Sequence, residues 1–260
     1  MSEFETVRYR REDAVAVITI HRPEAMNSFN AELRRDLLAA FEKARGDAET
    51  RVVVLTGEGR SFSAGADLKG SLSAERSVDQ QLQLEYRPIF ECIAEMDQPV
   101  IAAVGGSAAG IGMSFALACD LLVMAENAFL LSPFTTISLV PDGGLNWLLV
   151  HQLGYRRAFQ LSIECERIPA ERCVDLGLAN RTAPADSLLD DTIAWARSIA
   201  ERAPLSIAAT KKAMRHAAAN DWASTFDVEA PLQCRLKESE DCAEGIAAFF
   251  QKRKPEFKGR

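Results

Sequence analysis

The segment Pro99–Asp120 reads PVIAAVGGSAAGIGMSFALACD and contains a strand, a loop and a helix in close succession. Val100–Val104 is short and wholly apolar, which is typical of a strand buried on both faces of a parallel sheet. A loop of small residues follows at Gly105–Gly112, and Met113–Cys119 has the composition of a buried helix. Leu121–Ala125 is a second apolar run of strand type. Alternating strands and helices of this kind predict an α/β fold.

The N-terminal part of the chain extends the same pattern. Thr6–Arg10 and Ala14–Ile20 flank a polar turn and predict a β-hairpin. Asn30 is a suitable N-cap for a helix that ends at Gly46, because apolar residues recur after it at helical spacing. Arg51–Gly59, RVVVLTGEG, predicts another buried strand.

Helices are expected in two further regions. The first covers Val78–Met96, and the second lies beyond Asp186. Between them, Ser132–Gly144 is expected to be a loop. Beyond Asp186 the strand patterns stop, and three helical segments are predicted at residues 187–202, 204–219 and 222–250. We therefore expect a core over residues 1–195 and a helical region over 196–260 that serves as a lid, an assembly element or both.

The composition excludes several classes of protein. The 260 residues include 30 Lys and Arg against 37 Asp and Glu, a formal net charge of -7, so nucleic acid is not an expected partner. No apolar run approaches the roughly 18–20 residues of a membrane span, and the polar N-terminus has no secretory signal pattern. A membrane partner is therefore not expected either.

The cysteines and histidines indicate neither disulfides nor a metal site. Six cysteines are scattered along the chain without a C-x-x-C pair, which is typical of reduced thiols and predicts a cytoplasmic location. His21, His151 and His216 lack the spacing of metal ligands.

Three common ligand-binding motifs are incomplete. Gly105 and Gly110 have the spacing of a phosphate-binding P-loop, but Ile111 stands where its lysine is needed. Phe62 replaces the third glycine of a dinucleotide fingerprint, and the last glycine around Ser107 comes one residue late for a nucleophile elbow.

Two loops of small residues remain, Ser61–Leu68 and Gly105–Gly112, and each follows a buried strand. Small side chains let a ligand approach the backbone, and two such loops face to face would aim one N–H each at a single oxygen. Such a pair forms an oxyanion hole. From the loops alone, tight packing explains the small residues better than a site does.

Four segments, at residues 21–30, 61–70, 99–120 and 139–144, carry a resemblance to a known family: HRPEAMNSFN, SFSAGADLKG, the segment quoted first, and LVPDGG. Together they resemble the crotonase family, the enoyl-CoA hydratase/isomerase superfamily, over essentially the whole chain. FFQKRKPEFKGR at the end resembles its terminal helix. The resemblance implies a crotonase-like spiral of β-β-α units with a C-terminal helical region, assembled as a homotrimer or a dimer of trimers. It also implies acyl-CoA thioester substrates, so that CoA comes with the substrate and no separate cofactor is needed.

The resemblance assigns the oxyanion hole and the CoA site to positions of this chain. The backbone N–H groups of Ala66 and Ile111 match the two donors, although glycine is more usual at the second position. Ala64 matches the contact with adenine, and Ala25 and Met26 match the pantetheine-phosphate side. Further residues expected along the CoA are Ala66, Asp67, Leu68, Lys69 and Lys252, with the two lysines at the phosphates. For the lysines a solvated surface position is an equal alternative, and for Asp67 a capping or turn role is the better one.

The acid/base groups of the family's hydratases are two glutamates, whose positions here hold Ser114 and Phe134. Asp142 remains, in a loop that resembles the one carrying a catalytic aspartate in isomerases of phenylacetate-type degradation. Its hydrophobic sequence neighbours (Phe134, Leu139, Val140 and Trp147) predict a dry site and a raised carboxyl pKa. The structural alternative is an N-cap of a helix that starts near Gly143.

We therefore expect an acyl-CoA double-bond isomerase with a single Asp base. Two alternatives stay open: an enoyl-CoA hydratase with atypical acid/base residues, and a non-catalytic acyl-CoA-binding or assembly subunit. The sequence does not identify the acyl group, whose pocket is expected to involve Glu75–Pro88 and the C-terminal helices.

Overall fold

A six-stranded sheet forms the centre of the computed structural model, which describes residues 4–71 and 76–260. The hairpin β1 (Val7–Glu12) and β2 (Val15–Ile20) is antiparallel, as predicted. β3 (Val52–Gly57), β5 (Val100–Val104) and β7 (Leu121–Ala125) continue the sheet in parallel, and β10 (Arg181–Ala183) closes it in the order β1-β2-β3-β5-β7-β10. The apolar runs of the sequence are these central strands, whose side chains are almost all buried.

A second, four-stranded sheet consists of very short strands in the order β4-β6-β8-β9. They are β4 (Ser61–Ser63), β6 (Ser107–Ala109), β8 (Phe129–Leu131) and β9 (Ile168–Pro169). β3, β5 and β7 enter the first sheet, and the next strand along the chain enters the second one. With a helical segment after each pair, the chain forms the expected spiral of β-β-α units. The prediction of a loop over residues 105–112 was wrong in part, because β6 lies within it and pairs with β4 and β8.

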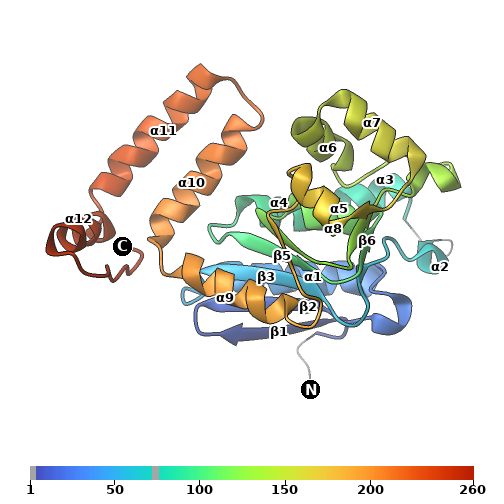
Figure 1. The fold of residues 1–260 in the computed structure, drawn as a ribbon, viewed down its shortest axis with the longest axis horizontal. Coiled ribbons are helices and arrows are strands. Elements are labelled where there is room, and N and C mark those ends of the chain that lie inside the picture. Colours follow the sequence, from blue (N-terminus) through green and yellow to red (C-terminus); the bar gives the residue numbers. More distant parts are fainter. Residues whose placement is uncertain (1–3, 72–75) are drawn as a thin grey trace.

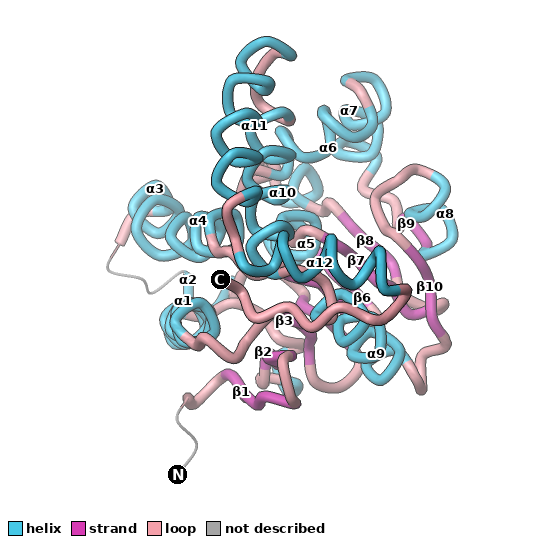
Figure 2. The backbone as a smooth tube through the Cα atoms, turned by 90° about the vertical axis from the view of Figure 1, so that its left-hand side faces the viewer, coloured by secondary structure: helices cyan, strands magenta, loops and turns pink. Residues whose placement is uncertain are grey.

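Helices cover both faces of the large sheet. α1 (Ala31–Gly46) and α9 (Leu188–Ala200) lie on opposite sides of β3 (Figure 2). Asn30 caps α1 as predicted, since its side chain accepts a hydrogen bond from Leu33 N at 2.9 Å.

The helix predicted over residues 78–96 is divided into three parts. α3 (Val78–Gln81) leads into one π-helical turn, Leu82–Tyr86, and then into α4 (Arg87–Glu95). Pro88 lies in the first turn of α4 and has no N–H to donate to the preceding turn, which accounts for the change of helix type there.

The remaining helices of the core flank the second sheet. α5 begins at the glycine-rich segment, two residues earlier than predicted, and is almost wholly buried. Figure 1 shows α6 and α7 beyond it, at the end of the molecule away from the C-terminus. The bounds are α2 (Leu68–Ser71), α5 (Ile111–Ala118), α6 (Leu145–Leu153), α7 (Tyr155–Glu164) and α8 (Ala170–Asp175).

The C-terminal region contains α10 (Pro204–Ala217), α11 (Trp222–Lys237) and α12 (Glu240–Gln251). α10 and α11 form a pair that projects from the sheets (Figure 1). The predicted single segment 222–250 is two helices, because the Ser239 hydroxyl accepts from Cys242 N at 3.0 Å and starts a new one. The predicted boundary at residue 195 falls inside α9, which packs on the sheet, so we propose that the division lies between α9 and α10.

Asp120 connects this region to the core. Its carboxylate accepts from Val100 N at 2.8 Å and pairs with Lys211 at 2.8 Å and Arg215 at 2.7 Å, both on α10. Within the described ranges, no helix combines the length and the apolar character that crossing a bilayer requires.

Candidate active site

The two loops of small residues meet at the start of α5. β4 and β6 pair in parallel, with Ser61 opposite Ser107, and this pairing brings the two following loops together. A Cβ on Gly65 would lie 3.0 Å from the carbonyl oxygen of Ala109, and one on Gly110 would lie 3.6 Å from the Cα of Gly65. Tight packing, the alternative considered for these residues, is therefore present, and it places the two backbones in contact.

The two proposed oxyanion donors lie on these touching loops. Phe29 N donates to Gly65 O at 2.8 Å and Asp67 N donates to Phe29 O at 3.0 Å, so the N–H of Ala66 between them faces the other way. Ile111 is the first residue of α5, where an N–H has no acceptor in its own helix. Over residues 4–71 and 76–260, neither of these two N–H groups donates a hydrogen bond.

Asp142 lies in the loop before α6, with its carboxyl partly buried. The Oδ1 atom is buried and has no hydrogen-bond partner among the described residues. Burial raises the pKa of this carboxyl from 3.8 to about 6, in the direction predicted. The N-cap interpretation was wrong, because α6 begins at Leu145 with Gly144 as its cap residue and no side chain caps it.

The main chain around Asp142 is fixed from two helices. Its carbonyl oxygen accepts from the hydroxyl of Ser114 on α5 at 2.9 Å and from Leu145 N on α6 at 3.1 Å. A Cβ on Gly143 would lie 2.7 Å from Cδ1 of Ile111 and 3.0 Å from Cζ of Phe90. The side chain of Ile111 therefore extends toward the Asp142 loop.

The hydrophobic sequence neighbours of Asp142 were predicted to exclude water from its carboxyl, and this was only partly right. Phe134 is buried and its ring lies near Gly110, but Leu139, Val140 and Trp147 are 53%, 70% and 45% exposed. These three side chains lie on the surface, so they contribute little to the burial of the Asp142 carboxyl. Packing of the loop against α4 and α5 accounts for the burial instead.

A cluster of aromatic rings around Phe115 supports the packing of the Asp142 loop against α4 and α5. The rings of Phe29 and Phe90 stack on Phe115 of α5, with centroids 4.6 and 4.2 Å away. Tyr86 lies at the edge of the cluster and accepts a hydrogen bond from Arg34 at 3.3 Å. Of the predicted pocket segment 75–88, Glu75 lies outside the described residues.

Most of the residues predicted to bind CoA are neighbours. Ala64 N donates to Met26 O at 2.9 Å, which joins the Ala25-Met26 segment to the first loop. Leu68 and Lys69 are exposed at the start of α2. The carboxylate of Asp67 accepts from Lys69 N at 3.2 Å and pairs with Arg22 at 3.2 Å, which is the turn role considered for it.

Lys252 is not brought to this group within one chain. It is the C-cap residue of α12, and α12 and α2 lie at opposite ends of the long axis (Figure 1). Contact between Lys252 and CoA phosphates therefore stays a prediction, and within one chain the residue lies apart from the other predicted CoA-binding residues.

Two residues that hold the first loop were assigned no role from the sequence. The buried amide of Asn27 donates to Ser61 O at 2.7 Å and to Glu58 O at 2.9 Å, and it accepts from Arg22 N at 2.9 Å. Arg22 in turn pairs with Asp67. Both lie in HRPEAMNSFN, so their place in that motif was the available signal.

The family model described as enoyl-CoA hydratase/isomerase matches residues 10–260 of this chain. The chain belongs to this family. Its members make up the crotonase superfamily, and the observed spiral and helical C-terminal region agree with that assignment.

Individual relatives support the assignment over the full length. A probable enoyl-CoA hydratase from Rhodobacter capsulatus is 39% identical over 257 residues, which cover 99% of each chain. A 1,2-epoxyphenylacetyl-CoA isomerase from Escherichia coli is 32% identical over 96% of this chain and 97% of its own. The crystal structure of an enoyl-CoA hydratase from Bacillus anthracis superposes with a TM-score of 0.93 at 30% identity, covering 98% of this chain and 100% of that one. The protein is therefore an enzyme of the acyl-CoA hydratase/isomerase type.

Proposed function

We propose that this family member is an acyl-CoA double-bond isomerase in which Asp142 is the base. The observation that carries the proposal is the buried Oδ1 of Asp142, which lacks a partner among the described residues and lies beside the segment that begins α5. A carboxyl with a pKa of about 6 is ionised at neutral pH and still basic enough to take a proton.

The mechanism moves one proton between two carbons of the acyl chain. The N–H groups of Ala66 and Ile111 hold the thioester oxygen, and Asp142 removes a proton from carbon 2 of a 3-enoyl thioester. The electron pair delocalises into a dienolate, whose negative oxygen is stabilised by the two N–H groups and by the N-terminal end of α5. The protonated Asp142 returns the proton to carbon 4, which leaves a 2-enoyl thioester. No separate cofactor takes part, since the CoA belongs to the substrate.

The residues at the two hydratase positions support isomerisation over hydration. The Phe134 ring cannot transfer a proton, and the Ser114 hydroxyl is engaged with the carbonyl of Asp142. Adding water needs a second acid/base group to share the water with the first, and neither residue supplies one.

The replacement Asp142→Asn tests the base. We expect kcat for a 3-enoyl-CoA to fall by roughly a thousandfold, because the amide takes no proton, while the Kd for the CoA ester stays within about twofold. In heavy water, we expect deuterium in the product of the native enzyme only at carbons 2 and 4, between which Asp142 moves the proton. Asp13→Asn in the exposed β1–β2 turn is the matched control and should change neither value. Full turnover by Asp142→Asn would contradict the assignment.

Hydration is the second candidate function, and the name of the Rhodobacter capsulatus relative favours it. It predicts a 3-hydroxyacyl-CoA product that carries oxygen from labelled water. An isomer of unchanged mass instead supports our proposal, and the two products separate in one mass-spectrometric assay. A CoA ester that raises the Tm without turnover would favour the non-catalytic alternative.

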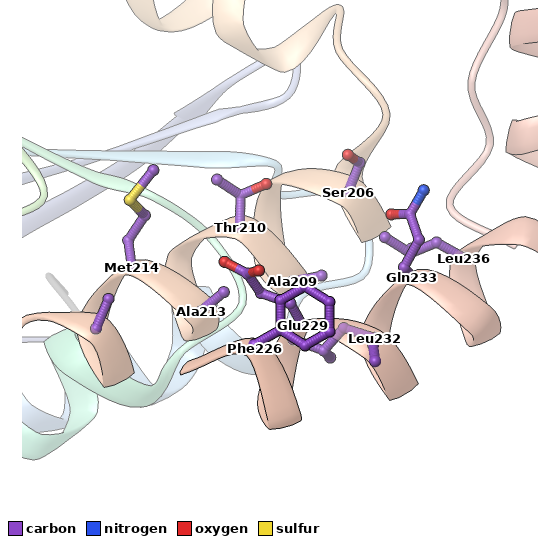
Figure 3. Close-up of a pocket in the computed structure, with 12 residues that line it drawn as sticks. Ser206, Ala209, Thr210, Ala213, Met214, Phe226, Glu229, Leu232, Gln233 and Leu236 are labelled. Carbon is purple, nitrogen blue, oxygen red and sulfur yellow. The ribbon is translucent and has the colours of Figure 1, made fainter. Parts of the chain in front are cut away.

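We also propose that the chain assembles as a homotrimer or a dimer of trimers through its C-terminal region. An open groove of about 470 Å³ lies between α10 and α11 and is lined by Ala213 and Met214 of α10 and by Phe226 and Leu232 of α11 (Figure 3). Lys252 lies at the end of α12, far from α2, so it would meet CoA phosphates only from a neighbouring copy.

A further inference from the structure

The hydroxyl of Ser114 is aimed across a helix–loop contact. A serine inside a helix usually satisfies its hydroxyl with the carbonyl four residues earlier. Here that contact, to Gly110 O, is 3.5 Å long, whereas the hydrogen bond to the carbonyl of Asp142 is 2.9 Å. Ser114 is completely buried, so water does not compete for the hydroxyl.

The position of the Asp142 carboxyl depends on its main chain. Oδ1 has no partner within the described ranges, so no hydrogen bond at that atom fixes the carboxyl. On the side of α6, Leu145 N donates to Asp142 O at 3.1 Å and Asn146 Nδ2 donates to Pro141 O at 2.6 Å. On the side of α5, the Ser114 hydroxyl supplies the hydrogen bond to the same loop.

Ser114 and Ile111 are three residues apart on α5 and therefore lie on one side of that helix. The same short helix thus carries an oxyanion donor and a hydrogen bond to the main chain of the base. A Cβ on Gly143 would lie 3.0 Å from Cβ of Ser114, so the helix and the loop are also in van der Waals contact there.

We infer that Ser114 is a positioning residue, which sets the distance between the oxyanion hole and the carboxyl of Asp142. The inference rests on the proposed function of Asp142. The hydroxyl takes no part in proton transfer; it acts through the Asp142 carbonyl, to which it is bonded. The position that the family resemblance associates with a hydratase glutamate holds, in this chain, a group that orients the isomerase base.

Replacing Ser114 by alanine removes the hydrogen bond and leaves the carboxyl itself unchanged. We expect Ser114→Ala to lower kcat by about tenfold with KM within about twofold, because small displacements of reacting groups cost rate more than binding. A loosened loop lets water reach the carboxyl, so the lower limb of the pH profile of kcat/KM should move to lower pH. A loss of stability alone does not move that limb.

Ser162→Ala is the matched control. Ser162 is also a buried helical serine, and its hydroxyl donates to Ala158 O at 2.8 Å within its own helix, α7. It should leave kcat and the pH profile unchanged. Ser114→Cys keeps the size of the side chain with a weaker donor and gives the same test if the alanine variant does not fold.

The outcomes separate this inference from the proposed function. A fall in kcat with a shifted limb for Ser114→Ala, and no change for Ser162→Ala, supports it. Unchanged kinetics of Ser114→Ala, or a fall without a shift of the limb, overturns it while leaving an inactive Asp142→Asn as evidence for the base. An active Asp142→Asn overturns the proposed function itself.

Discussion

At the scale of the residue, the important feature is how Asp142 is held. Its carbonyl accepts two hydrogen bonds, whereas one carboxyl oxygen is buried without a partner among the described residues. Such an arrangement disfavours the charged form and therefore raises the pKa. Under the proposed function, the raised pKa gives the protein a base of useful strength, and the buried carboxyl costs part of the stability that a solvated carboxylate would allow.

The raised pKa predicts a particular dependence on pH. Between about pH 4 and pH 6 the folded protein keeps a proton on Asp142 that the unfolded chain has lost. This group therefore lowers the free energy of unfolding as the pH rises through that window, and Asp142→Asn should remove this part of the slope. Urea unfolding of the native protein and of Asp142→Asn at pH 4 and pH 7 measures this slope. If the free energy of unfolding changed equally in both proteins between the two pH values, that would argue against a raised pKa. In the native enzyme, kcat/KM should rise with pH around 6, as the base ionises.

At the scale of the elements, α5 is where the site is assembled. Its first N–H belongs to the proposed oxyanion hole, and its hydroxyl at Ser114 meets the Asp142 loop. Its Phe115 ring stacks on Phe90 of α4 and on Phe29, which precedes α1. The loop can approach α5 this closely because position 143 is a glycine, with φ +62° and no room for a Cβ.

Gly143→Ala is expected to disturb this contact. The added Cβ would lie 2.7 Å from Ile111 Cδ1 in a left-handed backbone conformation, and we expect a loss of about 2–4 kcal/mol in the free energy of unfolding together with a lower kcat. Gly177→Ala is the control, because Gly177 has φ +73° with no atom within 4 Å of a Cβ. It should cost about 1–2 kcal/mol for the conformation alone and leave kcat unchanged. Equal losses of stability and kcat in the two variants would contradict the role of the contact.

At the scale of the whole molecule, the C-terminal helices are joined to the core by a buried ion pair but leave an apolar face open. Lys211 of α10 donates to Ile93 O at 2.8 Å and Gln98 O at 2.9 Å, besides its pairing with Asp120. Burial lowers the pKa of this amine, and the carboxylate of Asp120 opposes that effect. The orientation of α10, and with it that of the groove, is thereby fixed against the sheet.

The proposed assembly has a direct test. Light scattering should give the mass of three or six copies, and Phe226→Asp, which puts a charge into the groove between α10 and α11, should shift the mass toward one copy. Val78→Asp, at an exposed position in the first turn of α3, is the control and should not change the mass. A native protein that elutes as a monomer at micromolar concentration would contradict the proposal.

The sequence by itself determined the class of fold and which residues were candidates for the site. An apolar run such as Val100–Val104 predicts a buried strand from its own residues. Asn30 caps a helix by accepting from Leu33 N, three positions away, so both signals are local. The small residues of the two loops were visible in the same way, whereas Asp142 was singled out by the resemblance of its loop to that of the family's isomerases.

The tertiary structure decided what depends on contacts between distant segments. β4, β6 and β8 are three residues long, too short for a periodic pattern, and exist because they pair with one another. Whether Asp142 caps a helix, where Lys252 lies, and what Ser114 donates to are set by packing between elements. The burial of a side chain and its hydrogen-bond partners are properties of the folded chain. The local sequence sets the preferred backbone conformation, but it does not set which distant groups come into contact.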